Sequence, residues 1–225
     1  MKNELYVIIG AFGSGKSEYS VHLARKLKRE GRQVILADLD VVNPYFRTRD
    51  VREQFEQEGI EVIAPEGQFK HADLPMISPR IQGAIANPDY TVILDVGGDP
   101  AGCRALGRFV DAITDRGYKM LLVINTKRPF TSTADEIVLM HEMLEFASKL
   151  SITEYVCNTN LMEYTDENIV KTGIEIISEA AKRKDVEFKT YLVLDKYNSH
   201  IPDAIYGKVK ETMIYTLSKP WEIKI

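Results

Sequence analysis

The chain of 225 residues carries a formal net charge of −4, and its sequence is 44% hydrophobic and 28% charged. This composition is typical of a globular protein with a sizeable core, and the acidic balance argues against nucleic acid as a partner. Two cysteines, Cys103 and Cys157, are too few for a disulfide framework and favour a reducing compartment. Because no segment has the length and apolar character of a signal peptide or a membrane span, we expect a cytoplasmic protein, with residues 1–225 forming a single domain.

The first half of the chain contains four short apolar runs, each of which predicts a strand. LYVIIG from Leu5 predicts a strand, and the basic amphipathic run from Gly15 to Glu30 predicts a helix. QVILAD, EVIAPE and TVILDVGG predict three further strands, which begin at Gln33, Glu61 and Thr91. Near-continuous apolar runs of this kind are typical of parallel strands that are covered on both faces.

The second half of the chain alternates strand and helix patterns. In chain order they are a strand KMLLVINT from Lys119, a helix after Ser132, a strand ITEYVCNT from Ile152, a helix after Thr165, a strand TYLVLD from Thr190 and a helix from about Pro202 to Leu217. The whole pattern predicts an α/β fold, namely a doubly wound, mostly parallel sheet of about seven strands with helices on both faces. Ligands of such sheets bind at the carboxyl ends of the strands, so we look for the chemistry there.

A phosphate-binding motif joins the first strand to the first helix. Residues 10–17, GAFGSGKS, match GxxxxGK[ST] in full, and a strand before and a helix after are the context that this motif requires. The glycines let the backbone curl so that N–H groups point at phosphate oxygens, and the helix N-terminus adds positive potential. Lys16 can reach the β- and γ-phosphates, and Ser17 offers a hydroxyl to Mg²⁺. The predicted nucleotide-binding residues of this P-loop are therefore Gly10, Gly13, Ser14, Gly15, Lys16 and Ser17.

Acidic residues end the second and fourth predicted strands. Asp95 follows the apolar run from Thr91 and can hold Mg²⁺, and the DxxG spacing lets the backbone N–H of Gly98 contact a γ-phosphate. Asp38 and Asp40 end the preceding strand at alternate positions and so share a face. One of them can assist Mg²⁺ and the other can orient the attacking water. We predict Lys16 as a catalytic residue, and Ser17 and Asp95 as metal ligands.

Together these residues resemble the P-loop class that contains the septum-site-determining and chromosome-partitioning ATPases, dethiobiotin synthetase, the nitrogenase iron protein and the nickel-insertion GTPases. The resemblance covers about residues 4 to 200 and is most specific in the P-loop. It implies that Asp40 is the switch-I aspartate that positions water, and with this role we predict Asp40 as a second catalytic residue and Asp38 as a third metal ligand. The resemblance further implies that residues 97–102 form switch II. It also implies that Asn158, after the sixth strand, contacts the adenine base.

The sequence departs from this class at two places. Ala11 stands where the partitioning ATPases carry a signature lysine that reaches across a dimer, so a nucleotide-dependent homodimer would need another cation, such as Arg47 or Arg49. The segment 158–161, NTNL, lacks the aspartate of the guanine-reading NKxD motif. Without that carboxylate nothing accepts from the guanine N1 and N2 hydrogens, and we favour ATP.

Three functions fit this pattern. The first is a Mg-ATP-binding switch, a nucleoside-triphosphate hydrolase that acts with a partner protein. The second is an ATP-dependent kinase or ligase that acts on a small acid, with the loop from Gly67 to Pro79 over the γ-phosphate. The third is a GTPase metallochaperone. We favour the first because two switch motifs are present and no separate substrate domain is evident.

Overall fold

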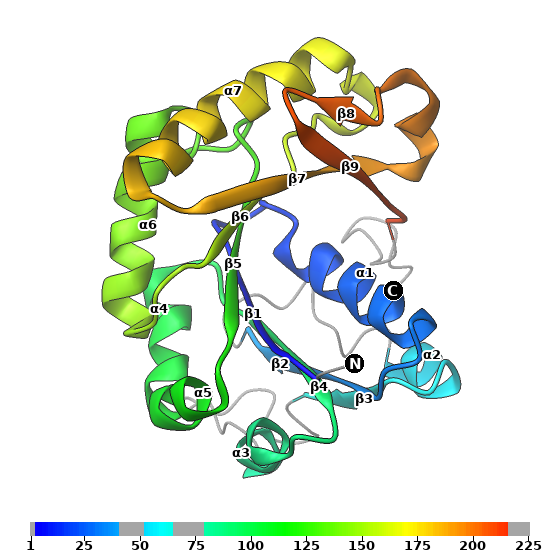
Figure 1. Cartoon of the computed structure of the whole chain (residues 1–225), viewed down its shortest axis with the longest axis vertical. Helices are drawn as coiled ribbons and strands as arrows, with labels where there is room; N and C mark the ends of the chain where they lie inside the picture. The colour runs from blue at the N-terminus through cyan, green and yellow to red at the C-terminus, as the bar shows by residue number, and fades with distance from the viewer. Residues whose placement is uncertain (1–2, 41–51, 65–78, 216–225) are drawn as a thin grey trace, which may run out of the picture.

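The computed structural model describes residues 3–40, 52–64 and 79–215. Its centre is a sheet of nine strands in the order β3-β2-β4-β1-β5-β6-β7-β9-β8, which Figure 1 shows almost edge-on. All neighbouring strands are parallel except β8 and β9, which are antiparallel. The strands are β1 Leu5–Ile9, β2 Val34–Leu39, β3 Glu61–Ile63, β4 Thr91–Val96, β5 Lys119–Ile124, β6 Glu154–Cys157, β7 Glu187–Leu194, β8 Ala204–Ile205 and β9 Lys208–Met213.

The seven predicted strands and the doubly wound sheet are confirmed, but the predicted helix from Pro202 is wrong. That segment forms β8 and β9, which raise the strand count from about seven to nine. Tyr206 and Gly207 join them with positive φ angles of 48° and 75°. A two-residue turn with both φ angles positive fits the right-handed twist of a hairpin. These residues therefore form a hairpin where Pro202, which suits a first helical turn, predicted the start of a helix.

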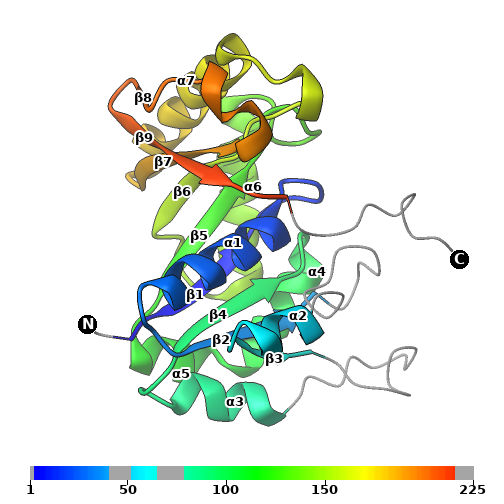
Figure 2. The same cartoon turned by 90° about the vertical axis from the view of Figure 1, so that its right-hand side faces the viewer.

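Helices cover both faces of the sheet. The α-helices are α1 Lys16–Arg29, α2 Arg52–Gln57, α3 Pro79–Ala86, α4 Pro100–Cys103, α5 Val110–Arg116, α6 Ala134–Ser148 and α7 Glu167–Lys184, and 3₁₀ turns occupy Arg104–Arg108, Met162–Tyr164 and Asp195–His200. Figures 1 and 2 show α1 and α2 on one face, with α3 to α7 on the other. The predicted helices after Gly15, Ser132 and Thr165 are confirmed as α1, α6 and α7. The N-cap of α6 lies one residue later than predicted, because Thr133 and Glu136 form the capping box.

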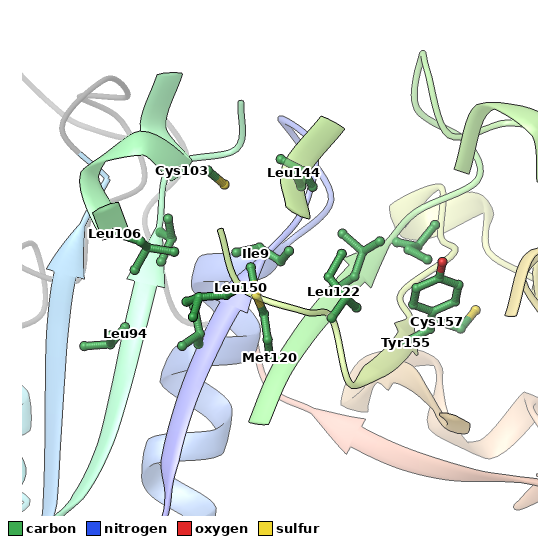
Figure 3. Close-up of a cluster of buried hydrophobic side chains, with 14 of the residues drawn as sticks. Ile9, Leu94, Cys103, Leu106, Met120, Leu122, Leu144, Leu150, Tyr155 and Cys157 are labelled. Atoms are coloured by element: carbon green, nitrogen blue, oxygen red, sulfur yellow. The ribbon is translucent and has the colours of Figure 1, made fainter. Parts of the chain in front are cut away.

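Side chains of β1 alternate between two apolar cores. Leu5, Val7 and Ile9 pack on the α6 side, whereas Tyr6 and Ile8 pack against α1. This alternation follows from the two-residue period of a strand. Figure 3 shows the larger core, in which side chains from β1, β4, β5 and β6 meet those of α4 and α6. Both cysteines are buried there as free thiols.

All the parallel strands end at the same edge of the sheet, and α1 starts at that edge directly after β1 (Figure 2). β1 lies between β4 and β5, so the loop that follows it is flanked by the ends of both strands. The chain therefore places residues 10–17, the end of β2, the end of β4 and the loops after β5 and β6 around one point.

Candidate functional site

The P-loop connects Ile9 of β1 to Lys16 of α1, and a turn from Ser14 N to Ala11 O, 3.0 Å, shapes it. Gly15 precedes α1 with φ of 88°, and no side chain caps the helix. The first N–H groups of α1 are therefore left for another acceptor, and a phosphate oxygen is the ligand that such a helix start favours. The Ser14 hydroxyl is also buried and forms no hydrogen bond within the described residues. The loop thus combines unused donors with a helix N-terminus.

Lys16 is buried at the start of α1 and forms an ion pair with the end of β2. Its Nζ lies 3.1 Å from Asp40 Oδ2, and the two side chains are only 7% and 2% exposed. The backbone N–H of Asp40 donates to Asp38 Oδ1 at 3.0 Å, which fixes the turn after the strand. A buried charge of either sign is costly unless it is paired, so each of these residues depends on the other. The structure therefore brings the two predicted catalytic residues into direct contact.

Asp38 and Asp95 are paired across neighbouring strands. They are register partners in β2 and β4. Their side chains share the sheet face that α1 covers, because Leu36 and Ile93, two residues earlier in each strand, pack in the α1-side core. Ser20, one turn into α1, donates its hydroxyl to Asp95 Oδ1 at 3.2 Å. Asp95 and Asp40 thus contact α1 directly, and Asp38 lies beside Asp95 on the same sheet face.

Asp95 is fully buried, and burial raises the pKa of its carboxyl to about 6, although the Lys16 charge opposes that rise. Its second oxygen, Oδ2, has no hydrogen-bond partner within the described residues. Ser17, another predicted metal ligand, is also buried. A buried carboxylate oxygen without a donor and a hydroxyl nearby suit Mg²⁺, which prefers oxygen ligands and takes few of them from the protein when phosphates supply others. The residues present fit the metal.

The described residues contain no cluster of three or more His, Cys, Asp or Glu side chains that could hold a metal ion by themselves. Cys103, which follows the β4 loop, is buried, and burial raises the pKa of its thiol to about 12. Its Sγ lies 3.8 Å from the carbonyl oxygen of Gly97. A thiol of this kind stays protonated, whereas the thiolate is the metal-binding form. Because neither a cluster of ligands nor this thiol is available, a metal ion beside the P-loop would take part of its coordination from bound phosphate.

The segment after β4 lies directly against the P-loop. A side chain at Gly98 would come within 2.9 Å of the Gly10 carbonyl oxygen, and one at Gly97 would meet the backbone of Gly102 at 2.8 Å. Asp99 then caps α4, because its side chain accepts from the N–H of Gly102. Gly98 is thus packed against the backbone of the phosphate loop, whereas Gly97 packs against Gly102 in α4.

Asn158 contacts the P-loop through its side chain. Its Nδ2 donates to the carbonyl oxygen of Ser14 at 2.7 Å, and a Cβ at Gly15 would come within 2.2 Å of the same nitrogen. Its Oδ1 lies 3.3 Å from Asn160 Nδ2. Both ends of the amide are therefore engaged with protein atoms. Contact between Asn158 and an adenine base stays a prediction.

An apolar pocket of about 460 Å³ opens beside the P-loop. Its walls come from the P-loop, the segment after β4, the loop after β5 and α6, and include Ala11, Phe12, Gly98, Phe130, Leu139 and Met143. Phe12 and Phe130 are exposed to 70% and 71%. Large aromatic side chains that are exposed next to the P-loop mark a surface on which another molecule can pack.

The predicted site residues all lie at this one edge of the sheet, in the P-loop, at the ends of β2 and β4 and after β6. Sequence reasoning did not assign to the site Ser20, which donates to Asp95, or Arg128, which donates to the Gly13 carbonyl. It also missed Asn125, which braces the loop that carries Arg128. Asn125 ends the apolar run of β5, and a polar residue at a strand end was a signal for it. Arg47, Arg49 and most of the loop from Gly67 to Pro79 lie outside the described residues.

A family model described as the CobQ/CobB/MinD/ParA nucleotide binding domain matches residues 6–200. Among curated proteins, no sequence matches the chain significantly. Across residues 3–40, 52–64 and 79–215, no helix is both long enough and apolar enough to cross a membrane.

Several solved structures share the fold. The cell division protein FtsY from Thermotoga maritima superposes with a TM-score of 0.60 at 21% identity, over 85% of this chain and 62% of that one. The signal recognition particle receptor FtsY from Elizabethkingia anophelis, in complex with GDP, gives 0.59 at 18% identity, over 86% and 58%. The signal recognition particle 54 kDa protein from Aeropyrum pernix K1, also with GDP, gives 0.55 at 20% identity, over 84% and 41%. The chain thus spans less than two thirds of each of these proteins.

Proposed function

Because the chain belongs to the CobQ/CobB/MinD/ParA nucleotide-binding domain family, we propose that it is a Mg²⁺-dependent nucleoside triphosphatase that works as a switch. The observation that carries this proposal is the buried contact between Lys16 of the P-loop and Asp40, beside the buried carboxylate of Asp95. Family membership supports nucleotide binding and hydrolysis in general. The switch, the base and the roles of single residues are our proposals.

Each residue has a distinct role in the proposed reaction. The P-loop N–H groups and Lys16 bind the β- and γ-phosphates, and Ser17, Asp95 and Asp38 hold the metal. A bound Mg²⁺ supplies positive charge to phosphate oxygens. Asp40 accepts a hydrogen bond from the attacking water and orients it, and Gly98 donates its backbone N–H to the γ-phosphate. Positioning and electrostatics of this kind are what phosphoryl transfer needs from a protein.

We propose ATP as the nucleotide, because the segment after β6 reads Asn158-Thr159-Asn160-Leu161 and offers no carboxylate to guanine. GTP is the second candidate, since two proteins that share the fold are bound to GDP. The choice between the two nucleotides rests on this one segment.

The apolar pocket supports action on another molecule. It touches both the P-loop and the segment after β4, so whatever packs there would contact residues that also contact the γ-phosphate. We propose that a partner protein packs on this surface. We also propose that the chain is a single domain, that it acts in the cytoplasm, and that it forms a nucleotide-dependent homodimer. The second candidate function is transfer of the γ-phosphoryl to a small acid; the loop from Gly67 to Pro79, which would cover the γ-phosphate in that case, lies mostly outside the described residues. For the metallochaperone alternative, the described residues offer no cargo-metal cluster.

The decisive experiment measures binding and hydrolysis of ATP and GTP by the purified chain. Lys16→Ala alone would remove the cation that pairs with the buried Asp40 carboxylate, so we use Lys16→Met in an Asp40→Asn background. Asp40→Asn is the matched control, because its amide oxygen can still accept from Lys16 Nζ. Asp40→Asn should bind a non-hydrolysable Mg-ATP analogue but hydrolyse ATP at least ~10-fold more slowly, because water orientation acts in the transition state. The double variant should bind at least ~10–100-fold more weakly, as expected for loss of a charged contact.

The outcomes separate the proposals. A wild type that neither binds nor hydrolyses either nucleotide would overturn the function. Faster turnover of GTP than of ATP would reverse the assignment of the base alone. Phosphorylation of an added acid without release of phosphate would favour the second candidate.

A further inference from the structure

The loop between β5 and α6 is braced from within and passes next to the P-loop. Thr131 donates its hydroxyl to the carbonyl oxygen of Asn125 at 2.9 Å. The backbone N–H of Lys127 donates to Asn125 Oδ1 at 3.0 Å, and the N–H of Arg128 donates to Asn125 O at 3.1 Å. Because three bonds converge on Asn125, the backbone at Arg128 has a defined position.

Arg128 extends from this loop to the P-loop. Its Nε donates to the carbonyl oxygen of Gly13 at 3.2 Å, and a Cβ placed on Gly13 would lie 3.2 Å from Nε and 3.5 Å from Cζ. The guanidinium group therefore lies against the backbone of Gly13, in the space that a side chain there would fill. Within the described residues, the side chain of Arg128 forms no other hydrogen bond.

Gly13 is a position where the orientation of the peptide matters. Its φ is 75°, and in a phosphate-binding loop the N–H groups point at the anion while the carbonyls point away. A donor on the Gly13 carbonyl holds that arrangement. The donor is also a cation, and its terminal nitrogens remain available as donors. Among residues 10–17 of the P-loop, Lys16 is the only cation.

We propose that Arg128 is a second cation of the phosphate site, supplied by the same chain: a positioning residue that fixes the Gly13 peptide and adds positive charge on the carbonyl side of the loop that binds the triphosphate. This inference rests on the proposed function, because it assigns a role at that site. It explains how the P-loop can be charged from the β5–α6 side although Ala11 offers no charge.

The test compares Arg128→Ala, Arg128→Lys and the matched control Lys127→Ala, whose exposed side chain is the neighbouring cation. The dissociation constant of a non-hydrolysable Mg-ATP analogue should rise at least ~10-fold in Arg128→Ala, as for loss of one charge-assisted hydrogen bond. Arg128→Lys should recover part of that loss, because it restores the charge but not the planar donor. In turnover, KM should rise while kcat changes less than ~3-fold, since the contact is made before the transition state.

Lys127→Ala should match the wild type, and the melting temperature of nucleotide-free Arg128→Ala should stay within ~2 °C of it, because the contact is exposed. Unchanged affinity in Arg128→Ala would overturn the inference and leave the proposed function standing. Loss of affinity with no recovery in Arg128→Lys, or with a large fall in melting temperature, would show a structural role and also overturn it.

Inorganic tripolyphosphate separates this inference from the choice of nucleotide. If the wild type binds tripolyphosphate more tightly than Arg128→Ala does, the cation assignment holds whichever nucleotide is used. If the wild type binds neither nucleotide nor tripolyphosphate, both the phosphate site and the role of Arg128 are wrong.

Discussion

At the scale of single residues, Asp95 combines two opposing demands. Its carboxylate is buried, and burial raises its pKa to about 6, so the ionised form is costly at neutral pH. The same burial leaves Oδ2 without a hydrogen-bond partner in the described part of the chain. A residue kept at a cost to stability is typical of a functional site.

Asp95→Asn should therefore stabilise the nucleotide-free protein while it removes the response to Mg²⁺. We expect the free energy of unfolding at pH 7 to rise by ~1–3 kcal/mol, because a neutral amide replaces a buried charge. Nucleotide affinity should no longer depend on Mg²⁺ concentration. Urea unfolding and a magnesium titration measure the two effects. A less stable variant whose nucleotide affinity still responds to Mg²⁺ would contradict both.

Asn158 leads to a second prediction at this scale. Because its Nδ2 already donates to Ser14 O, Asn158→Ala should weaken ATP and GTP by the same factor, about 10-fold for one lost bond to the phosphate loop. Asn87→Ala, in the turn before β4, is the control and should change neither affinity. Competition binding of the two nucleotides supplies the measurement. A loss confined to ATP would instead restore the prediction that Asn158 reads the adenine edge.

The sequence predicted the P-loop and the acidic strand ends because local spacing encodes them. GxxxxGK[ST] is a contiguous motif, and Asp38, Asp40 and Asp95 directly follow apolar runs. Arg128 was not predicted, since its contact with Gly13 joins residues 115 positions apart. The sheet order makes that contact, and no local pattern records it.

At the scale of secondary-structure elements, the strands were easier to predict than the short helices. Long apolar runs mark strands that helices cover on both faces, and β1, β4 and β5 are runs of this kind. Helix α4 spans only Pro100–Cys103, too short for a helical period to show. Segment 202–213 was wrongly predicted as a helix because Pro202 suits a first helical turn. The positive φ angles of Tyr206 and Gly207 instead form the turn of a hairpin.

Two glycines test that explanation. Gly207→Ala should lower the free energy of unfolding by about 1 kcal/mol or more, because alanine is strained at a φ of 75°. Gly83→Ala, inside α3, should raise it by ~0.5–1 kcal/mol through helix propensity. A Cβ at either position meets no atom within 4 Å, so packing does not enter the comparison. Denaturant unfolding of both variants provides the check, and equal shifts would refute the hairpin geometry.

At the scale of the whole molecule, the two ends of the sheet differ. The carboxyl ends of the strands hold the candidate site. The amino ends are joined by Glu4, whose carboxylate lies 2.6 Å from Lys119 Nζ and 3.0 Å from Arg32 Nη1. Tyr6 donates its hydroxyl to the same group. Burial opposes ionisation of Glu4, but these three partners outweigh it and lower its pKa to about 2.

This cluster predicts how acid acts on the fold. A carboxyl with a lowered pKa stabilises the folded state above its unfolded value near 4.5, and that contribution is lost as the pH falls towards 2. Glu4→Gln should therefore be less stable than the wild type at pH 7, with a difference that shrinks below about pH 4.5. Urea unfolding between pH 3 and 7 follows it, with the exposed Glu56→Gln as control. A difference that grows on acidification would rule out this assignment.

The position of β1 in the sheet also sets an order of events during synthesis. β1 is synthesised before both of its neighbours in the sheet, because Leu5 pairs with Val92 and Tyr6 with Lys119. A nascent chain that ends before residue 91 holds an apolar segment with neither of its neighbours, and such exposed segments are prone to aggregate and fold slowly. Asn158, which holds the loop after β1, emerges later still. The P-loop thus gains its full set of contacts only after residue 158 has been made, so a ligand that needs the finished loop binds late in folding.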